Sequence, residues 1–326
     1  MSKNSNDPDL PEYLDVERAA ARIRPFVRQT PVLNDPGLDE QLACQLYIKC
    51  ENLQGSGAFK LRGASNAVAR LREQNIAGDV ATHSSGNHGA SLALAARLDG
   101  RKAHVVMPGN ASPFKVSAVR DQGGEVYFCQ PNQASREAGL QELIAAGHIA
   151  VPPYDHSDII AGQGTASLEL IQQVADLDII VSPVGGGGLI GGTALVAHHY
   201  GIKIIGAEPS GAADTANSLQ LGHRVDSVNA DTIADGLRAL VGVRNFALIH
   251  ELVSEVITVS DDETRQAMIL LWRHFRLLVE PSSAVVLAAI RQKPELFRGK
   301  KVAAIISGGN ITPADWLEVS EWQAEA

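Results

Sequence analysis

Short apolar runs alternate with segments of helical spacing along most of the chain. Runs rich in β-branched residues and bounded by Gly, Pro or Ser predict strands at 46–50, 79–84, 103–108, 125–129, 178–184, 202–208 and 301–307. Between these runs, apolar residues recur with a helical period over 64–71, 89–98, 160–174 and 262–278. This alternation predicts an α/β fold of mostly parallel sheets with helices on both faces.

The bulk composition narrows the class of protein and of ligand. A chain of 326 residues with 45% hydrophobic and 20% charged residues can bury a large core, in one large domain or in two. The formal net charge of -9 argues against a nucleic acid or an anionic membrane as partner, because both bind basic surfaces. We therefore expect a small-molecule ligand.

The sequence gives no sign of a disulfide framework, of export or of membrane insertion. Cys44, Cys50 and Cys129 are odd in number and lack CxxC spacing, which indicates buried free thiols in a reducing cytoplasm. Residues 1–13 are polar and acidic, unlike a signal peptide, and no apolar run reaches the roughly 18 residues of a membrane span. We expect a cytoplasmic protein.

The loops that follow strands carry the candidate chemistry, because open α/β sheets bind ligands at the carboxyl ends of their strands. Four such loops are SSGNHGA (84–90), VGGGGLIGG (184–192), EPSGAAD (208–214) and SGGN (307–310). In the second loop, N–H groups of consecutive glycines and a following helix N-terminus would converge on an anion. The alternatives are a turn chosen for close packing and a dinucleotide site with Glu208 as its acidic residue. Four glycines in a row, without G-K-[ST], favour a single phosphate.

Two other loops offer hydrogen-bonding groups to the rest of a ligand. The loop 84–90 opens a predicted helix and can hold a carboxylate, while Asn87 can donate to a phenolate oxygen. N-capping is the alternative role of Ser84 and Ser85. The hydroxyl of Ser307, at the end of the last predicted strand, can hydrogen-bond a heterocyclic nitrogen but cannot stabilise a full positive charge there.

Lys60, in SGAFKLRGA (56–64), completes this set. Most lysines are solvated, but an amine kept partly desolvated beside Phe59 has a lowered pKa and becomes a nucleophile toward an aldehyde. An aldehyde, a phosphate, a phenolate and a ring nitrogen belong together in pyridoxal 5'-phosphate. The sequence therefore predicts this cofactor.

With these residues in view, the chain resembles the fold-type-II pyridoxal-phosphate enzymes and, within them, the serine/threonine dehydratase and serine racemase family. The resemblance rests on the order and spacing of RQTPVL, SGAFKLRGA, SSGNHG, IIAGQGT, VGGGGL, EPSGAAD, IADGL, VEPSSA and SGGN. It implies two open, twisted, mostly parallel sheets with helices on both faces. It also implies a large cofactor-binding domain (1–78 and 157–326), a small mobile domain (79–156) and a homodimer.

The same resemblance implies which residues contact the cofactor. They are Phe59, Lys60, Asn87, Gly185, Gly186, Gly187, Gly188, Gly236, Glu280 and Ser307. Lys60 would bond covalently to the aldehyde, and the four glycines would hold the phosphate. Glu280 would lie near the ring, with a structural carboxylate that caps the next helix as the alternative.

Substrate and metal contacts are also implied by the resemblance. Ser84, Ser85, Asn87, His88 and Arg136 would surround the substrate. Ser85 would face Lys60 as a second acid or base, and Arg136 would pair with a second carboxylate or be a solvated helix arginine.

A divalent cation is implied at Glu208, the Ala212 carbonyl and Asp214. Carboxylate and main-chain oxygens are hard ligands that suit Mg²⁺, Ca²⁺ or Mn²⁺.

The implied activity is the elimination of water and ammonia from a 3-hydroxy amino acid, such as serine, threonine or 3-hydroxyaspartate, to give a 2-oxo acid. Racemisation of serine or a related amino acid is the alternative. A nicotinamide or flavin oxidoreductase would leave SGAFK and SGGN unexplained. A cofactor-less regulatory relative would not need Lys60, Asn87 and Ser307 together.

Overall fold

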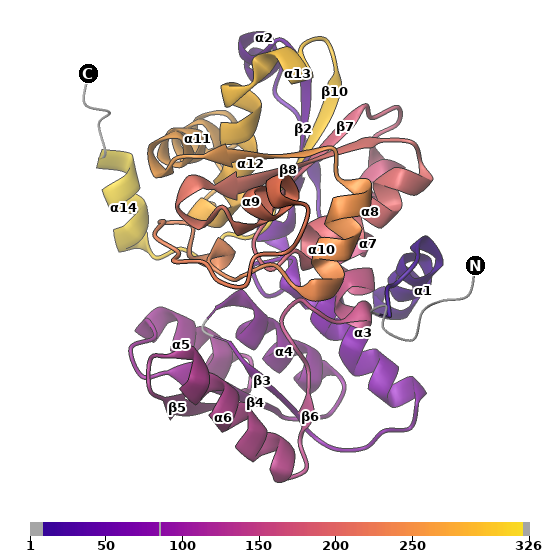
Figure 1. Ribbon diagram of the computed structural model, residues 1–326, viewed down its shortest axis with the longest axis vertical. Coiled ribbons are helices and arrows are strands. Elements are labelled where there is room, and N and C mark those ends of the chain that lie inside the picture. The colour runs from indigo at the N-terminus through magenta and orange to yellow at the C-terminus, as the bar shows by residue number, and fades with distance from the viewer. Residues whose placement is uncertain (1–8, 85, 322–326) are drawn as a thin grey trace.

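Two sheets organise the chain, and the computed structural model describes residues 9–84 and 86–321 (Figure 1). The larger sheet has six strands in the order β1-β2-β10-β7-β8-β9, and the smaller has four in the order β5-β4-β3-β6. The strands are β1 (Val32–Leu33), β2 (Gln45–Cys50), β3 (Val80–His83), β4 (Ala103–Pro108), β5 (Glu125–Cys129), β6 (Ile149–Ala150), β7 (Ile179–Pro183), β8 (Lys203–Pro209), β9 (Glu255–Val259) and β10 (Lys301–Ile306).

Helices connect the strands and cover the sheets. They are α1 (Tyr13–Ile23), α2 (Pro36–Leu42), α3 (Lys60–Glu73), α4 (Asn87–Leu98), α5 (Pro113–Asp121), α6 (Gln133–Ala145), α7 (Ser157–Gln173), α8 (Gly188–His199), α9 (Asp214–Leu221), α10 (Val243–Leu252), α11 (Asp261–Phe275), α12 (Pro281–Gln292), α13 (Pro294–Phe297) and α14 (Pro313–Glu321). Short 3₁₀ turns lie at η1 (Glu51–Leu53), η2 (Ser210–Ala212) and η3 (Asp235–Leu237).

The sheets are parallel apart from the antiparallel pair β1 and β2. Strands β4 and β7 are buried along their whole length, and a strand of that kind needs cover on both faces of its sheet. In the larger sheet α12 packs on one face, with Val181 and Val302, and α8 on the other, with Ile180 and Ile305. The predicted fold class, α/β with two mostly parallel sheets and helices on both faces, is confirmed.

The predicted strands agree with the observed ones to within one residue at each end. Three strands were missed. β1 and β6 have two residues each, too few to show a period, whereas the four consecutive β-branched residues of β9 (EVITV) carried a usable signal. The helix predicted at 262–278 ends earlier, at Phe275, because Arg276 takes a left-handed φ of 57° at its C-cap.

The path of the chain places the candidate site between the sheets. The chain leaves the larger sheet through α3, builds the smaller sheet with α4, α5 and α6, and returns through α7, which packs against α3 (Figure 1). Among the described residues, no helix is both long and apolar enough to cross a membrane.

Candidate active site

Lys60 is the first residue of α3, where the chain leaves the larger sheet. The turn before it lies against the end of β10, because the Phe59 N–H donates to the Ser307 carbonyl at 2.9 Å. Ala58 also pairs with Gly308 in an isolated β-bridge. The lysine turn and the SGGN loop are therefore neighbours, although they lie at opposite ends of the sequence.

The Lys60 amine lies in a largely apolar setting. Its Nζ donates to the Pro153 carbonyl at 2.8 Å and lies 5.1 Å from the centroid of the Phe59 ring. Burial lowers the pKa of Lys60 to about 8, although the charge of Glu280 acts in the opposite direction. A larger share of this amine is uncharged near neutral pH than for a solvated lysine, which makes it a better nucleophile.

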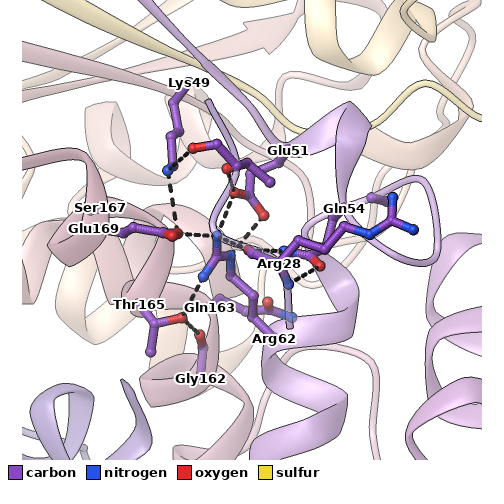
Figure 2. Close-up of polar contacts among 12 residues, drawn as sticks. Arg28, Lys49, Glu51, Gln54, Arg62, Gly162, Gln163, Thr165, Ser167 and Glu169 are labelled. Carbon is purple, nitrogen blue, oxygen red and sulfur yellow. Dashed lines mark hydrogen bonds and ion pairs between the residues drawn. The ribbon is translucent and has the colours of Figure 1, made fainter. Parts of the chain in front are cut away.

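A buried ion cluster holds the first turn of α3 in place (Figure 2). The Arg62 guanidinium donates to both carboxylate oxygens of Glu51, from Nε at 2.7 Å and from Nη2 at 2.8 Å, and also bonds Glu169 on α7. Lys49 lies 3.3 Å from Glu169, and Thr30 donates to Glu51 at 2.6 Å. Burial alone would raise the pKa of Glu51, but Arg62 brings it below its usual range. The turn that carries Lys60 is thus fixed from β2, η1 and α7.

The glycine loop presents a set of unpaired backbone donors. Gly185, Gly186, Gly187 and Gly188 are buried, and none of their N–H groups has an acceptor among the described residues. Buried backbone N–H groups without partners are rare in proteins, and these four precede or begin helix α8. They form a ready site for an anion, and the phosphate of the predicted cofactor fits this donor set.

Tyr154 joins the glycine loop to the lysine, and it was missed from the sequence. A Cβ added to Gly186 would overlap the Tyr154 ring, whose centroid lies 6.0 Å from the Lys60 Nζ. Burial raises the pKa of Tyr154, so its hydroxyl stays protonated at neutral pH. Tyr154 follows β6, the two-residue strand that sequence periodicity did not reveal, and so no strand end marked its loop.

Asn87 and Glu280 meet across the space between the two sheets. The Asn87 Nδ2 donates to both oxygens of Glu280, at 2.8 and 3.1 Å, and Asn310 donates to Asn87 Oδ1 at 2.8 Å. Glu280 is the N-cap residue of α12, but its side chain makes no cap hydrogen bond. Burial raises the pKa of Glu280 to about 7, and its carboxylate faces Asn87 rather than the helix it precedes.

Ser307 and Gly236 both hydrogen-bond serines at the start of α12. The Ser307 hydroxyl lies 3.0 Å from that of Ser283, which also donates to the Gly308 carbonyl. The Gly236 N–H donates to Ser282, next to Ser283 on α12, at 2.9 Å. Both residues are therefore held by the first turn of α12, which follows Glu280.

The loop before α4 holds the candidate substrate contacts. Ser84 accepts hydrogen bonds from the N–H groups of Gly86 and Gly89, although the N-cap residue of α4 is Gly86. His88 is buried, and its Nε2 lies 3.1 Å from the Val151 carbonyl. Burial lowers the pKa of His88 to about 3, so the ring is neutral. Ser85 lies outside the described residues.

Arg136 lies on α6, near the end of β3. Its Nε is buried without a hydrogen-bond partner among the described residues. Burial lowers the pKa of His83, at the end of β3, and the charge of Arg136 acts in the same direction, so the two groups are close. Arg136 is partly exposed, and its buried Nε leaves a role toward a second carboxylate as a prediction.

Glu208 and Asp214 form a separate acidic pair. Glu208 accepts hydrogen bonds from the N–H groups of Thr215 and Ala216, and Asp214 Oδ2 accepts from Val241. Asp214 Oδ1 is buried without a partner among the described residues. Burial raises the pKa of Glu208 to about 8 and also raises that of Asp214. Two buried carboxylates with a free oxygen suit a divalent cation, and the adjacent Ala212 is buried as well.

Comparison with known proteins identifies the family. Residues 23–308 match the family described as pyridoxal-phosphate dependent enzyme. The chain belongs to this family. Its members among similar proteins include the beta-hydroxyaspartate dehydratase of Paracoccus denitrificans, 43% identical over 305 residues that cover 93% of this chain and 97% of the relative. The L-threo-3-hydroxyaspartate ammonia-lyase of Saccharomyces cerevisiae is 41% identical and is matched over 93% of this chain and 94% of the relative.

Solved structures agree with this family assignment. The structure of maize serine racemase superposes with a TM-score of 0.91 at 38% identity, over 95% of this chain and 97% of that one. Membership makes the chain a pyridoxal-phosphate dependent enzyme and confirms the predicted cofactor class. The roles of the individual site residues stay predictions.

Replacing Arg62 by Met tests the ion cluster beneath the lysine. The change leaves Glu51 buried without its guanidinium, and we expect a loss of about 3–5 kcal/mol in the free energy of unfolding. Urea denaturation followed by circular dichroism measures this loss. The double variant with Glu51→Gln should recover part of it.

Arg70→Met is the matched control on the same helix. Arg70 is partly exposed and pairs with Glu73 and Asp158 near the surface, so its loss should cost less than about 1 kcal/mol. Equal small losses for Arg62→Met and Arg70→Met would contradict the role given to the cluster.

Proposed function

We propose that this enzyme removes water and ammonia from a 3-hydroxy amino acid, and that 3-hydroxyaspartate is its preferred substrate. The net reaction breaks the Cβ–OH, Cα–H and Cα–N bonds and releases one 2-oxo acid and one ammonium ion, with the water lost first and consumed again on hydrolysis. The observation that carries the proposal is a partly desolvated lysine in the same region as four buried glycine N–H groups that have no acceptor among the described residues.

The residues present fit the cofactor of the family. Gly185 to Gly188 would hold its phosphate, Lys60 would bond to its aldehyde carbon, and Asn87 would donate to its phenolic oxygen. Ser307 would meet its ring nitrogen, and Phe59, Gly236 and Glu280 would line the ring. When bound, the cofactor draws electrons away from the α-carbon of the substrate through its conjugated ring.

The proton transfers would be carried out by side chains of the protein. The Lys60 amine, with a pKa that burial lowers to about 8, would take the proton from Cα as general base. The Ser307 hydroxyl, 3.0 Å from that of Ser283, would offer a neutral hydrogen bond to the ring nitrogen of the cofactor and would leave that nitrogen uncharged. Such a neutral contact would suit the loss of a β-hydroxyl group from the substrate.

The substrate carboxylate would bind at the N-terminus of α4. The N–H groups of Asn87 and His88 have no acceptor within residues 9–84 and 86–321 and lie in the first turn of that helix. Because the His88 side chain lies against Val151, His88 would contribute its backbone N–H rather than its ring. Ser84 and Ser85 are proposed to complete this site.

Arg136 would select a substrate with a second carboxylate. Its buried Nε lacks a partner among the described residues, and a buried guanidinium is most stable when paired with an anion. The names of two relatives, a dehydratase and an ammonia-lyase of hydroxyaspartate, support the same substrate.

Racemisation is the second candidate function. The likeness to maize serine racemase favours it, since the two chains share 38% identity over nearly their whole length. A proton supplied by Ser85 on the face opposite Lys60 would give this outcome.

Closure of the small domain would exclude water from the site. We assign residues 1–78 and 157–326 to the large domain and 79–156 to the small one, a division supported by the smaller sheet, whose strands all lie between Val80 and Ala150. An ion pair between Lys115 on α5 and Asp235 on η3 would hold the closed form. The homodimer and the cytoplasmic location stay predictions.

A divalent cation is proposed at Glu208, the Ala212 carbonyl and Asp214. The free buried oxygen of Asp214 and the raised pKa of Glu208 both support a positive charge at this point. Oxygen ligands favour Mg²⁺, Ca²⁺ or Mn²⁺.

A panel of 3-hydroxy amino acids tests the proposed reaction. We expect 2-oxo acid release with a higher kcat/KM for threo-3-hydroxyaspartate than for serine or threonine. Arg136→Gln should lower kcat/KM for 3-hydroxyaspartate about 10- to 100-fold, because it removes a charge-assisted hydrogen bond worth about 1.5–3 kcal/mol. The same variant should leave kcat/KM for serine within about threefold, because serine has no second carboxylate for a charge-assisted bond.

Arg120→Gln, on the exposed face of α5 beside Phe128, is the control and should leave both substrates unaffected. Interconversion of enantiomers without 2-oxo acid would favour the racemase. An equal loss for both substrates in Arg136→Gln would contradict selection through a second carboxylate.

Calcium titration tests the proposed cation site. Ca²⁺ at about 100 times its Kd should stabilise the protein by about 2.7 kcal/mol, seen as a raised midpoint of thermal unfolding, and a chelator should reverse it. Asp214→Asn should abolish the response, whereas Asp226→Asn, which alters a solvent-exposed side chain, should keep it. A response that persists in Asp214→Asn would remove these residues from the site.

A further inference from the structure

Three potential metal ligands lie where three neighbouring strands begin. Asp79 directly precedes β3, His104 is the second residue of β4, and His148 directly precedes β6. β3 is parallel to both of the other strands, with Val80 level with Ala103 on one side and with Ile149 on the other. The three segments therefore enter the smaller sheet side by side.

The register also places the three side chains on one face of the sheet. His104 is level with Ala81, and Asp79 lies two residues before Ala81, so both point to the same side. His148 precedes Ile149, the partner of Val80, and shares that side. This is the face covered by α6, where Ala81 packs with Leu143.

The donor atoms converge. One ligand atom from each of the three residues lies within 4.8 Å of the others, and the His104 Nε2 is 3.6 Å from the Asp79 Oδ2. The rings of His104 and His148 stack with their centroids 3.9 Å apart. Among the described residues, this is the only group of three or more His, Cys, Asp or Glu side chains whose ligand atoms converge in this way.

His104 has an unused nitrogen in the middle of this group. Its side chain is only 7% exposed, and its Nε2 has no hydrogen-bond partner among the described residues. A buried ring nitrogen without a partner is costly, and the distance of 3.6 Å to Asp79 is too long for a hydrogen bond to remove that cost.

The other nitrogen of His104 is held by a hydrogen-bond chain. Its Nδ1 lies 3.0 Å from the Tyr127 hydroxyl, which donates in turn to Glu125 at 3.2 Å. Because the Tyr127 hydroxyl donates its proton to Glu125, its oxygen accepts a hydrogen bond from His104. The Nδ1 of His104 then carries the proton, and the lone pair of its Nε2 is free. Histidines that bind metals are commonly oriented by such a carboxylate-linked contact on their second nitrogen.

We propose that Asp79, His104 and His148 bind a transition-metal ion of the Zn²⁺ class, with water completing its coordination. Two imidazoles and one carboxylate suit this class, and three protein ligands leave room for water. Asp79 and His148 are partly exposed, which gives the ion a route from solvent.

This site differs in place and chemistry from the sites described above. It lies at the amino ends of β3, β4 and β6, whereas the loop of Ser84 to His88 follows the carboxyl end of β3. Its nitrogen ligands also separate it from the all-oxygen set at Glu208 and Asp214. Bound metal would link the starts of three strands and so stabilise the smaller sheet.

Zinc titration of the cofactor-loaded enzyme tests this proposal. Zn²⁺ is added in competition with a chromogenic chelator, with Ca²⁺ in excess to fill the oxygen site. We expect one Zn²⁺ per chain and a raised thermal midpoint. His148→Ala and Asp79→Asn should each weaken Zn²⁺ binding at least about tenfold, and Tyr127→Phe, which removes the contact behind His104, about tenfold.

His223→Ala, which removes an exposed histidine that follows α9, outside the smaller sheet, is the matched control and should bind Zn²⁺ as the parent does. Asp79, His148 and Tyr127, the three residues altered in this test, are partly or largely exposed, so these variants should keep their fold. The proposal is overturned if the parent binds no stoichiometric Zn²⁺, or if His148→Ala and Asp79→Asn bind it as tightly as His223→Ala.

Discussion

The site depends on a difference between two cations in the first turn of α3, the buried Arg62 and the partly buried Lys60. Arg62 is held by both oxygens of Glu51 and by Glu169, so its charge is fully compensated. Lys60, two residues earlier, has no carboxylate in ion-pair contact among the described residues, and burial lowers its pKa. The ion pairs of Arg62 fix the turn. Because Lys60 has no such pair, its amine loses its proton more easily and stays reactive.

Lys60 also differs from Lys49, a fully buried lysine nearby. The Lys49 amine donates to the Thr30 carbonyl and to Gln173 and lies 3.3 Å from Glu169. These contacts hold it in a structural role. The Lys60 amine bonds a single carbonyl, that of Pro153. The N–H groups of the glycine loop, which have no acceptor in the part of the chain that the structure describes, leave a positive potential that favours an anion. A ligand with an aldehyde and a phosphate satisfies both ends at once.

Much of this arrangement could be predicted from the sequence because the signals are local. Strand β7 is a continuous apolar run, the glycine loop follows it directly, and Lys60 stands at a turn before a helical pattern. The contacts that could not be predicted join residues distant in sequence. Tyr154 reaches Gly186 because the chain returns from the smaller sheet beside the larger one.

The zinc site was missed for a related reason. Asp79, His104 and His148 are each unremarkable in the sequence, and only the register of β3 with β4 and β6 brings them together. β6 itself has too few residues to show a period. For Glu280 the position before α12 suggested a helix cap, and only the contact with Asn87 showed where its carboxylate points.

Identifying the lysine that carries the cofactor tests the central claim most directly. The purified enzyme is reduced with borohydride, digested, and its peptides are mapped by mass spectrometry for a pyridoxyl group. The account predicts one label per chain, on the peptide that contains Lys60, and a sharply reduced label in Gly186→Ala, where a Cβ would overlap Tyr154. A label on Lys49, Lys115 or any other lysine, or full labelling of Gly186→Ala, would contradict it.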